Sequence, residues 1–218
     1  MTSNNQAIAP AIKRSRPIVL YISGTFLVLL TICAVVGPWI APHDPYIQEL
    51  RQSLQTPSAQ HWLGTDDQGR DILSRLLYSL RIGFYAAFLS VGIGVVLGVP
   101  IGAIMGYCRG KLDWLGMRVV DAALCIPPIV LILVLVSVLG RGLTNAMLAL
   151  GFLFVFPYLK LVRGEMMALR KTLFAQAART TGIGHVAIVM RHLVPSIFPA
   201  IIVQTGLMLP VAFLVEAT

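Results

Sequence analysis

The chain has 218 residues, of which 57% are hydrophobic and only 12% are charged. A soluble domain of this length has too little interior to bury that much apolar surface, so the composition excludes a water-soluble fold and predicts an all-α integral membrane protein. The net charge of +8 at pH 7 is explained by orientation in the membrane and by anionic lipid, and it does not require a nucleic-acid partner.

Five apolar windows are long enough to cross a bilayer, which takes roughly 20 residues of helix. They cover residues 18–40, 83–106, 122–140, 143–162 and 196–215. The first window follows Lys13, Arg14 and Arg16, as a secretory signal would. It is too long for a typical signal core and no A-x-A cleavage site closes it, so we expect an uncleaved spanning helix.

The basic residues indicate how the chain crosses the membrane. With a cytoplasmic N-terminus and five alternating spans, twelve of the 17 Lys and Arg residues lie inside and five lie outside, as the positive-inside rule requires. The predicted organisation is one membrane domain. It comprises a cytoplasmic tail (1–17), a first span (18–40), an external segment (41–82) and a membrane core (83–218) with a basic cytoplasmic loop at about 163–195.

The external segment contains the polar stretch LGTDDQGRD, residues 63–71. Thr65 and Gln68 have the spacing of a helix capping box, and the apolar residues after Gly69 recur at helical intervals. This pattern predicts a short amphipathic helix at the outer interface that turns into the second span, with Asp71 and Arg75 paired at i, i+4. As a metal site, the set His61, Asp66, Asp67 and Asp71 matches no known ligand pattern, so no metal is predicted.

Glycine and proline punctuate the predicted spans. Four glycines recur every four residues along the second span and predict close helix packing; they are Gly94, Gly98, Gly102 and Gly106. Prolines are expected to kink or break the spans, which suits both packing and gating; they are Pro100, Pro127, Pro128, Pro157 and Pro210. Few ionisable groups lie inside the spans, which argues against an ion-coupled transporter. Asp121 is expected to pair with Arg118.

The predicted cytoplasmic loop reads as helix, glycine turn, helix. Residues 165–181, EMMALRKTLFAQAARTT, place apolar side chains on one helical face, and Gly182 and Gly184 interrupt the pattern before it resumes up to Pro195. From the pattern alone, a pair of interfacial helices is an alternative to a docking element.

Two motifs carry a resemblance to a known family. The run HWLGTDDQGRDILSRLLYSLRIG closely resembles the segment before the second membrane helix in inner-membrane permeases of ABC importers for dipeptides, oligopeptides and nickel. The matching positions are Leu63, Gly64, Thr65, Asp66, Gly69, Arg70, Asp71, Ser74 and Arg75. The resemblance extends over residues 17–218, nearly the whole chain.

The second motif is similar to the cytoplasmic E-A-A-x3-G motif of these permeases. The corresponding residues are Gln176, Ala177, Ala178, Arg179, Gly182 and Pro195. The resemblance implies that this loop is a coupling helix that docks on an ATPase subunit. Gln176 stands where the family has an acid, which implies coupling that is weaker or tuned to a different partner.

The resemblance implies a type I ABC importer (MetI-like) permease fold in a bacterial inner (plasma) membrane. Five spans are present, and the family's sixth is missing, so the chain is expected to be a fragment or a truncated product. The implied function is to form the pathway for peptides or nickel and other metal chelates. Implied partners are the lipid bilayer, a second homologous permease, two ABC ATPases and an extracytoplasmic solute-binding protein.

The chain itself is not expected to be an enzyme. It has no G-x-x-x-x-G-K-[ST] loop to hold ATP phosphates and no readable catalytic set, so no cofactor is predicted on this chain and ATP is expected to be used by partner subunits. Cys33, Cys108 and Cys125 are odd in number and lack C-x-x-C spacing, which argues against disulfides and zinc. The alternatives left open are a non-transporting membrane scaffold and an inactive truncated permease.

Overall fold

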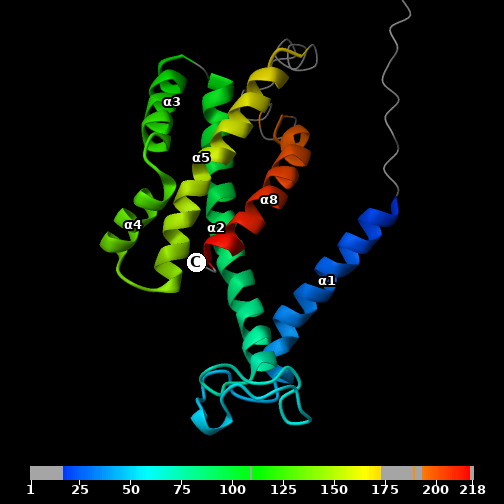
Figure 1. Ribbon diagram of the computed structural model, residues 1–218. Helices are drawn as coiled ribbons and strands as arrows, with labels where there is room; N and C mark the ends of the chain where they lie inside the picture. Colours follow the sequence, from blue (N-terminus) through cyan, green and yellow to red (C-terminus); the bar gives the residue numbers. More distant parts are fainter. Residues whose placement is uncertain (1–16, 109, 173–188, 190–192, 217–218) are drawn as a thin grey trace, which may run out of the picture. The chain divides into compact units, whose positions relative to one another are not determined.

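The computed structural model describes residues 17–108, 110–172, 189 and 193–216. This part of the chain is helical (Figure 1), with α1 (Pro17–Ile40), the 3-10 turn η1 (Leu50–Gln52), α2 (Ile72–Cys108), α3 (Lys111–Leu124), α4 (Pro128–Leu139), α5 (Leu143–Leu169) and α8 (Val194–Glu216). The chain divides into two compact units, Met1–Arg81 and Ile82–Thr218. Each unit is described by itself.

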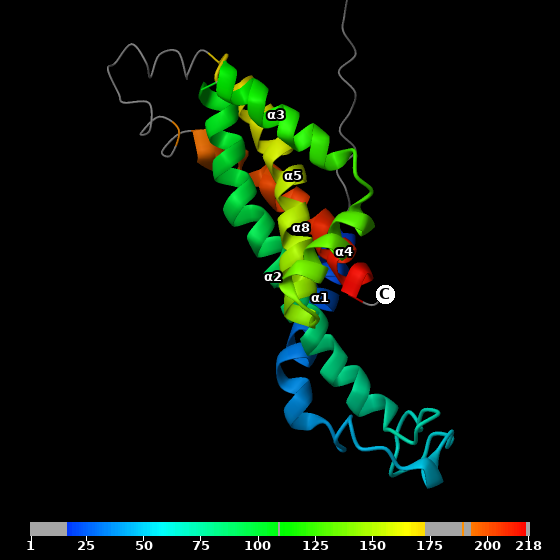
Figure 2. The ribbon, with the colours of Figure 1, turned by 90° about the vertical axis from the view of Figure 1, so that its left-hand side faces the viewer.

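Four helices in the described part of the chain, α1, α2, α5 and α8, are long and apolar enough to cross a membrane. A fifth candidate is the pair α3 and α4, which are bent by 93° at the break between them (Figure 2). The all-α membrane fold is therefore confirmed, with four or five candidate spans. The window 122–140, predicted as one span, contains this bend, which lies at the Pro127–Pro128 break expected from the sequence.

Proline position explains where the helices break. Pro127 and Pro128 separate α3 from α4, since a proline cannot donate a backbone hydrogen bond and disfavours helical geometry in the residue before it; Pro128 then begins α4. By contrast, Pro100, Pro157 and Pro210 lie inside continuous helices. These three prolines therefore interrupt no helix, and the kinks expected at them stay a prediction.

The unit from Ile82 onward is built around α5, which packs against both α4 and α8 (Figure 1). Its core includes Tyr158, Val162 and Met166 of α5, which are fully buried, together with Ile197 of α8. Because both faces of α5 meet neighbouring helices, this helix is the most buried of the candidate spans.

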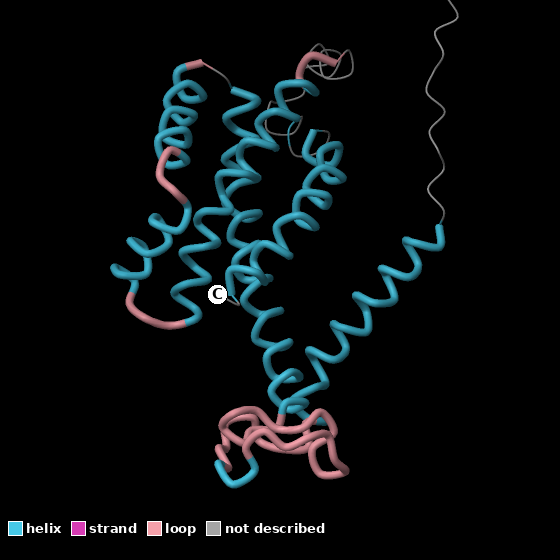
Figure 3. Tube along the Cα trace, viewed as in Figure 1, coloured by secondary structure: helices cyan, strands magenta, loops and turns pink. Residues whose placement is uncertain are grey.

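The unit up to Arg81 consists of α1, the segment of residues 41–71 and the start of α2. Only 11% of the spanning window of α1 is buried, as expected of a helix that faces lipid or another chain. In the 41–71 segment, the structure shows loop with one 3-10 turn and a single isolated bridge, Thr65–Asp71 (Figure 3).

Helix α2 runs without interruption from Ile72 to Cys108. The separate amphipathic helix expected before the second span is therefore wrong, and its residues form the first turns of α2. No proline occurs in this helix before Pro100, so nothing in the covalent structure ends it at the predicted turn.

Candidate functional site

The polar motif of residues 63–75 folds around the carboxylate of Asp66. Its Oδ1 accepts hydrogen bonds from the backbone N–H groups of Gln68 and Arg70, both at 2.9 Å. Its Oδ2 accepts from Arg70 Nε at 2.8 Å and from the Arg75 guanidinium. Desolvation acts to raise the pKa of Asp66, but the hydrogen bonds from Gln68 and Arg70 and the charge of Arg70 outweigh it and lower the pKa to about 2. The charged Asp66 carboxylate therefore holds the turn in place through these hydrogen bonds.

Two glycines make this turn possible. Gly64 and Gly69 have φ angles of 80° and 74°, in the left-handed region that glycine adopts without strain. A Cβ on Gly69 would lie 1.9 Å from the carbonyl oxygen of Glu49, and one on Gly64 would lie 2.4 Å from that of Gln55. The chain packs so closely at both points that no side chain fits.

The cap of α2 is Asp71, and not the capping box predicted at Thr65 and Gln68. Asp71 Oδ2 accepts from the backbone N–H and the hydroxyl of Ser74, both at 2.8 Å, which satisfies donors in the first turn of the helix. Thr65 instead joins two parts of the loop: its hydroxyl accepts from the Gln55 N–H at 2.8 Å and donates to the Gln52 carbonyl. The signal available in the sequence was an aspartate placed directly before the apolar run that begins at Ile72.

The expected i, i+4 pair between Asp71 and Arg75 is also wrong, because Arg75 turns to Asp66. The second carboxylate oxygen of Asp71, Oδ1, lies 2.9 Å from His61 Nδ1. Burial of Asp71 acts to raise its pKa, but the hydrogen bonds from Ser74 and His61 lower it to a value below the ordinary one.

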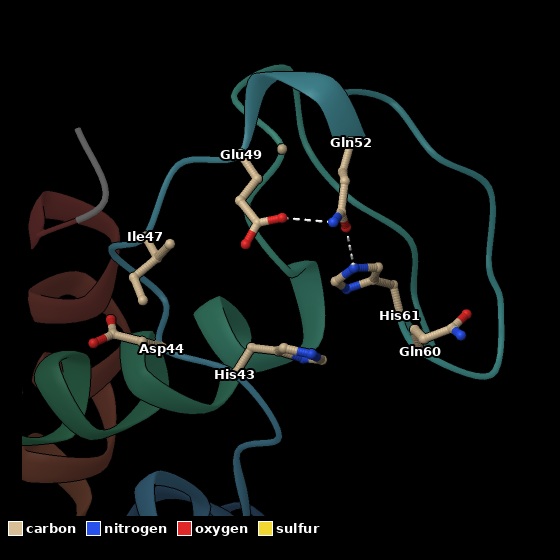
Figure 4. A pocket seen from close by; sticks show the side chains of 8 residues that line it. His43, Asp44, Ile47, Glu49, Gln52, Gln60 and His61 are labelled. Carbon is tan, nitrogen blue, oxygen red and sulfur yellow. Dashed lines mark hydrogen bonds between the residues drawn. The ribbon is translucent and has the colours of Figure 1, made fainter.

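Two histidines meet beside this cap. The ring centroids of His43 and His61 are 4.8 Å apart, and a cavity of about 210 Å³ opens next to them, also lined by Asp44, Glu49 and Gln52 (Figure 4). Of the four residues weighed from the sequence as metal ligands, the structure brings only His61 and Asp71 together. His43 joins them instead, so that single ligand atoms of these three residues all lie within 4.8 Å of one another.

In the second unit, the glycine stripe of α2 lies against α5. A Cβ added to any of the four would lie 2.6–2.8 Å from an atom of α5; the nearest atoms belong to Phe154 for Gly94, Val155 for Gly98, Leu159 for Gly102 and Arg163 for Gly106. Ser90, one turn before the stripe, donates to the carbonyls of Ala86 and Met147. The two helices are thus in near backbone contact.

The end of α5 that leads into residues 173–188 is tied to α2 and α3. Arg163 makes two hydrogen bonds to the buried Asp113 of α3, that from Nη2 being 2.8 Å long, and Arg170 donates to the Tyr107 carbonyl at 2.6 Å. The pairing of Asp121 with Arg118 is wrong: Asp121 is 3.0 Å from Lys160 Nζ. The Arg118 guanidinium lies 5.4 Å from the centroid of the Trp114 ring.

The predicted coupling loop is only partly visible. Gln176, Ala177, Ala178, Arg179 and Gly182 lie outside the described residues. Pro195 occupies the first turn of α8, where a proline is tolerated because its missing N–H would have no helical partner.

Comparison with known proteins identifies the family. Residues 98–217 match the family model described as the binding-protein-dependent transport system inner membrane component. The chain belongs to this permease family. Residues 19–57 match the N-terminal TM domain of oligopeptide transport permease C. The resemblance stated from the two sequence motifs is therefore confirmed.

Several curated permeases are similar along most of the chain. The probable D,D-dipeptide transport system permease protein DdpC of Escherichia coli (strain K12) is 36% identical over 90% of this chain. The nickel transport system permease protein NikC of the same strain is 36% identical over 83% of it, and the dipeptide transport system permease protein DppC of Bacillus subtilis (strain 168) is 32% identical over 91%. The chain spans 66%, 65% and 62% of the lengths of these relatives. Permease subunits of this family are not catalytic, as expected for this chain.

Proposed function

We propose that the chain is the pathway-forming permease subunit of an ATP-driven importer with the type I (MetI-like) fold. The observation that carries this proposal is the family match over residues 98–217, which includes the E-A-A-like loop. The solute is a peptide or a nickel or other metal chelate, because the similar proteins are permeases named for D,D-dipeptide, nickel and dipeptide transport.

The proposed complex contains a second homologous permease, two ABC ATPases and an extracytoplasmic binding protein that delivers the solute. The N-terminus lies in the cytoplasm of a bacterial cell, because this orientation places most Lys and Arg residues inside. The sparsely buried α1 supports this arrangement, since a lone apolar helix needs lipid or a partner subunit to cover it.

In this proposal the cytoplasmic loop transmits movement from the ATPases to the pathway. The loop is flanked by α5 and α8, and the end of α5 is held to α3 by the Arg163–Asp113 pair and to α2 by Arg170. A displacement of the loop therefore acts on several helices together, as in rigid-body switching between two arrangements. Close packing of α2 on α5 supports their motion as one body.

The test is solute-stimulated ATP hydrolysis after co-expression with the proteins encoded beside this chain. A Gly182→Pro variant should insert normally but lose stimulation, because proline cannot adopt a turn that needs glycine and it removes a backbone donor. The control is Gly164→Ala, since a Cβ there meets nothing within 4 Å. If hydrolysis by the Gly182→Pro complex still responds to solute, the coupling role of the loop is refuted. If the chain is instead a membrane scaffold, its activity should not depend on the ATPases at all.

A further inference from the structure

The ring of His61 is held between two hydrogen-bond acceptors. Its Nδ1 lies 2.9 Å from Asp71 Oδ1, and its Nε2 lies 2.9 Å from Gln52 Oε1. The Gln52 amide is oriented by its own donation to the Glu49 carboxylate (Figure 4), so its oxygen faces the ring. A neutral imidazole has one N–H and satisfies only one of two acceptors. Either a second proton on the ring or a metal ion beside the other ring nitrogen satisfies the remaining acceptor.

A second imidazole lies at the same place. The His43 ring is tilted by 34° against the His61 ring, with the centroids 4.8 Å apart, and the His43 backbone N–H donates to Ser74 Oγ at 3.1 Å. His61 and Asp71 are buried, with 8% and 2% of their surface exposed, and Asp71 Oδ2 is committed to Ser74. This leaves Asp71 Oδ1 and one ring nitrogen of each histidine as neighbouring atoms that could bind a metal ion.

We propose that His43, His61 and Asp71 bind a divalent transition-metal ion on the 41–71 segment. In the tetrahedral geometry that zinc prefers, metal–ligand bonds of about 2.1 Å place each pair of ligand atoms about 3.4 Å apart. The His61 Nδ1 to Asp71 Oδ1 distance of 2.9 Å already suits neighbouring ligands. Since the three ligand atoms lie within 4.8 Å of one another, the widest pair must close by about 1.4 Å at most, and the exposed side chain of His43 can supply this movement.

The bond at the far side of His61 supports this assignment. When Nδ1 binds the metal, Nε2 keeps the proton and donates to Gln52 Oε1, which Glu49 holds in place. Metal-bound histidines generally have such a partner on the other ring nitrogen, because it fixes the tautomer and the orientation of the ring.

The donor set also selects the class of ion. Two imidazoles with one carboxylate favour Zn²⁺, Ni²⁺, Co²⁺ or Cu²⁺, whereas Ca²⁺ and Mg²⁺ prefer oxygen ligands alone. The adjacent cavity of about 210 Å³ has room for water to complete the coordination, and Asp44 and Glu49 add negative charge. The bound ion links His43 and His61 to the residue that caps α2. It braces the segment whichever solute is carried, so the inference does not depend on the proposed function.

The test uses the full chain in detergent with an affinity tag that contains no histidine. The three cysteines are replaced by serine to remove thiolates, and bound metal is stripped with EDTA before calorimetric titration with Zn²⁺. We expect one ion per chain and a higher unfolding temperature with Zn²⁺. His43→Gln and His61→Gln should each weaken binding at least about 10-fold, and Gln52→Ala, which removes an outer partner, about 10–100-fold. In Cu²⁺ spectra by electron paramagnetic resonance, His43→Gln should remove one coupled nitrogen.

The matched control is the double variant His185→Gln and His192→Gln, which removes two histidines of the predicted cytoplasmic loop and should bind Zn²⁺ as the parent does. Absence of stoichiometric binding would overturn the proposal. So would unchanged binding in a His43→Gln variant that unfolds at the parent temperature in EDTA.

Discussion

The close contact between α2 and α5 makes Gly102→Ala an informative perturbation. The added Cβ would lie 2.6 Å from the Leu159 carbonyl oxygen and 3.1 Å from its Cα. Both atoms belong to the backbone, so a change of side-chain rotamer cannot relieve the overlap and the helices must move apart.

The magnitude follows from two opposing effects. Overpacking a well-packed contact costs about 1–3 kcal/mol, whereas replacing glycine by alanine inside a helix gains up to about 1 kcal/mol. The expected net loss of stability for Gly102→Ala is about 1–2 kcal/mol. Gly92 lies on the same helix and a Cβ there meets nothing within 4 Å, so Gly92→Ala should be neutral or stabilising.

The assay is equilibrium unfolding of each variant by sodium dodecyl sulfate in mixed micelles, followed by circular dichroism. Gly102→Ala should unfold at a lower detergent fraction than the parent chain, and Gly92→Ala should not. Equal midpoints for the two variants would refute the reasoning, because they would show that the stripe has no closer neighbour than the rest of α2.

Three further outcomes follow from the charges and the turn. Asp113→Asn should lower the free energy of unfolding by about 3 kcal/mol, because it leaves Arg163 without its buried partner. Adding Arg163→Gln should recover part of that loss in a double-mutant cycle. Strictly additive effects of the two substitutions would contradict the pairing. Since folding lowers the pKa of Asp66 from 3.8 to about 2, its contribution to stability is complete above about pH 4 and is lost as the pH falls toward 2. Across this range, Asp66→Asn should weaken the dependence of unfolding on pH and leave the part that comes from the lowered pKa of Asp71, whereas replacing the exposed Asp67 by asparagine should leave the dependence unchanged. Gly69→Ala should open the 41–71 segment to limited proteolysis, and cleavage at the parent rate would show that the left-handed turn is dispensable.

Much of the helical framework was predictable from the sequence. A bilayer requires a minimum length of apolar helix, so windows 18–40 and 196–215 match α1 and α8 within two residues, and window 143–162 matches the start of α5, which continues to Leu169. The pair Pro127–Pro128 marked the break between α3 and α4 because the constraint on a proline backbone is local. Pro100, Pro157 and Pro210 interrupt no helix, since a helix packed among neighbours or lipid can continue through one lost hydrogen bond.

The partners of charged side chains were not predictable. Rules for neighbours along a helix favoured Asp71 with Arg75 and Asp121 with Arg118, but the structure pairs Arg75 with Asp66 and Asp121 with Lys160. In the same way, nothing in the spacing of His43 and His61 indicated that their rings meet beside the cap of α2.

Sequence alone therefore determined the membrane class, most of the span positions and the permease family. The length of an apolar helix and the backbone limits of proline are local properties, and a motif with many matching positions indicates a family without any knowledge of the fold. Tertiary structure alone decided which side chains meet. The turns at Gly64 and Gly69 and the contact of α2 with α5 bring together groups that lie tens of residues apart, and hydrogen bonds form according to distance in space and not along the chain.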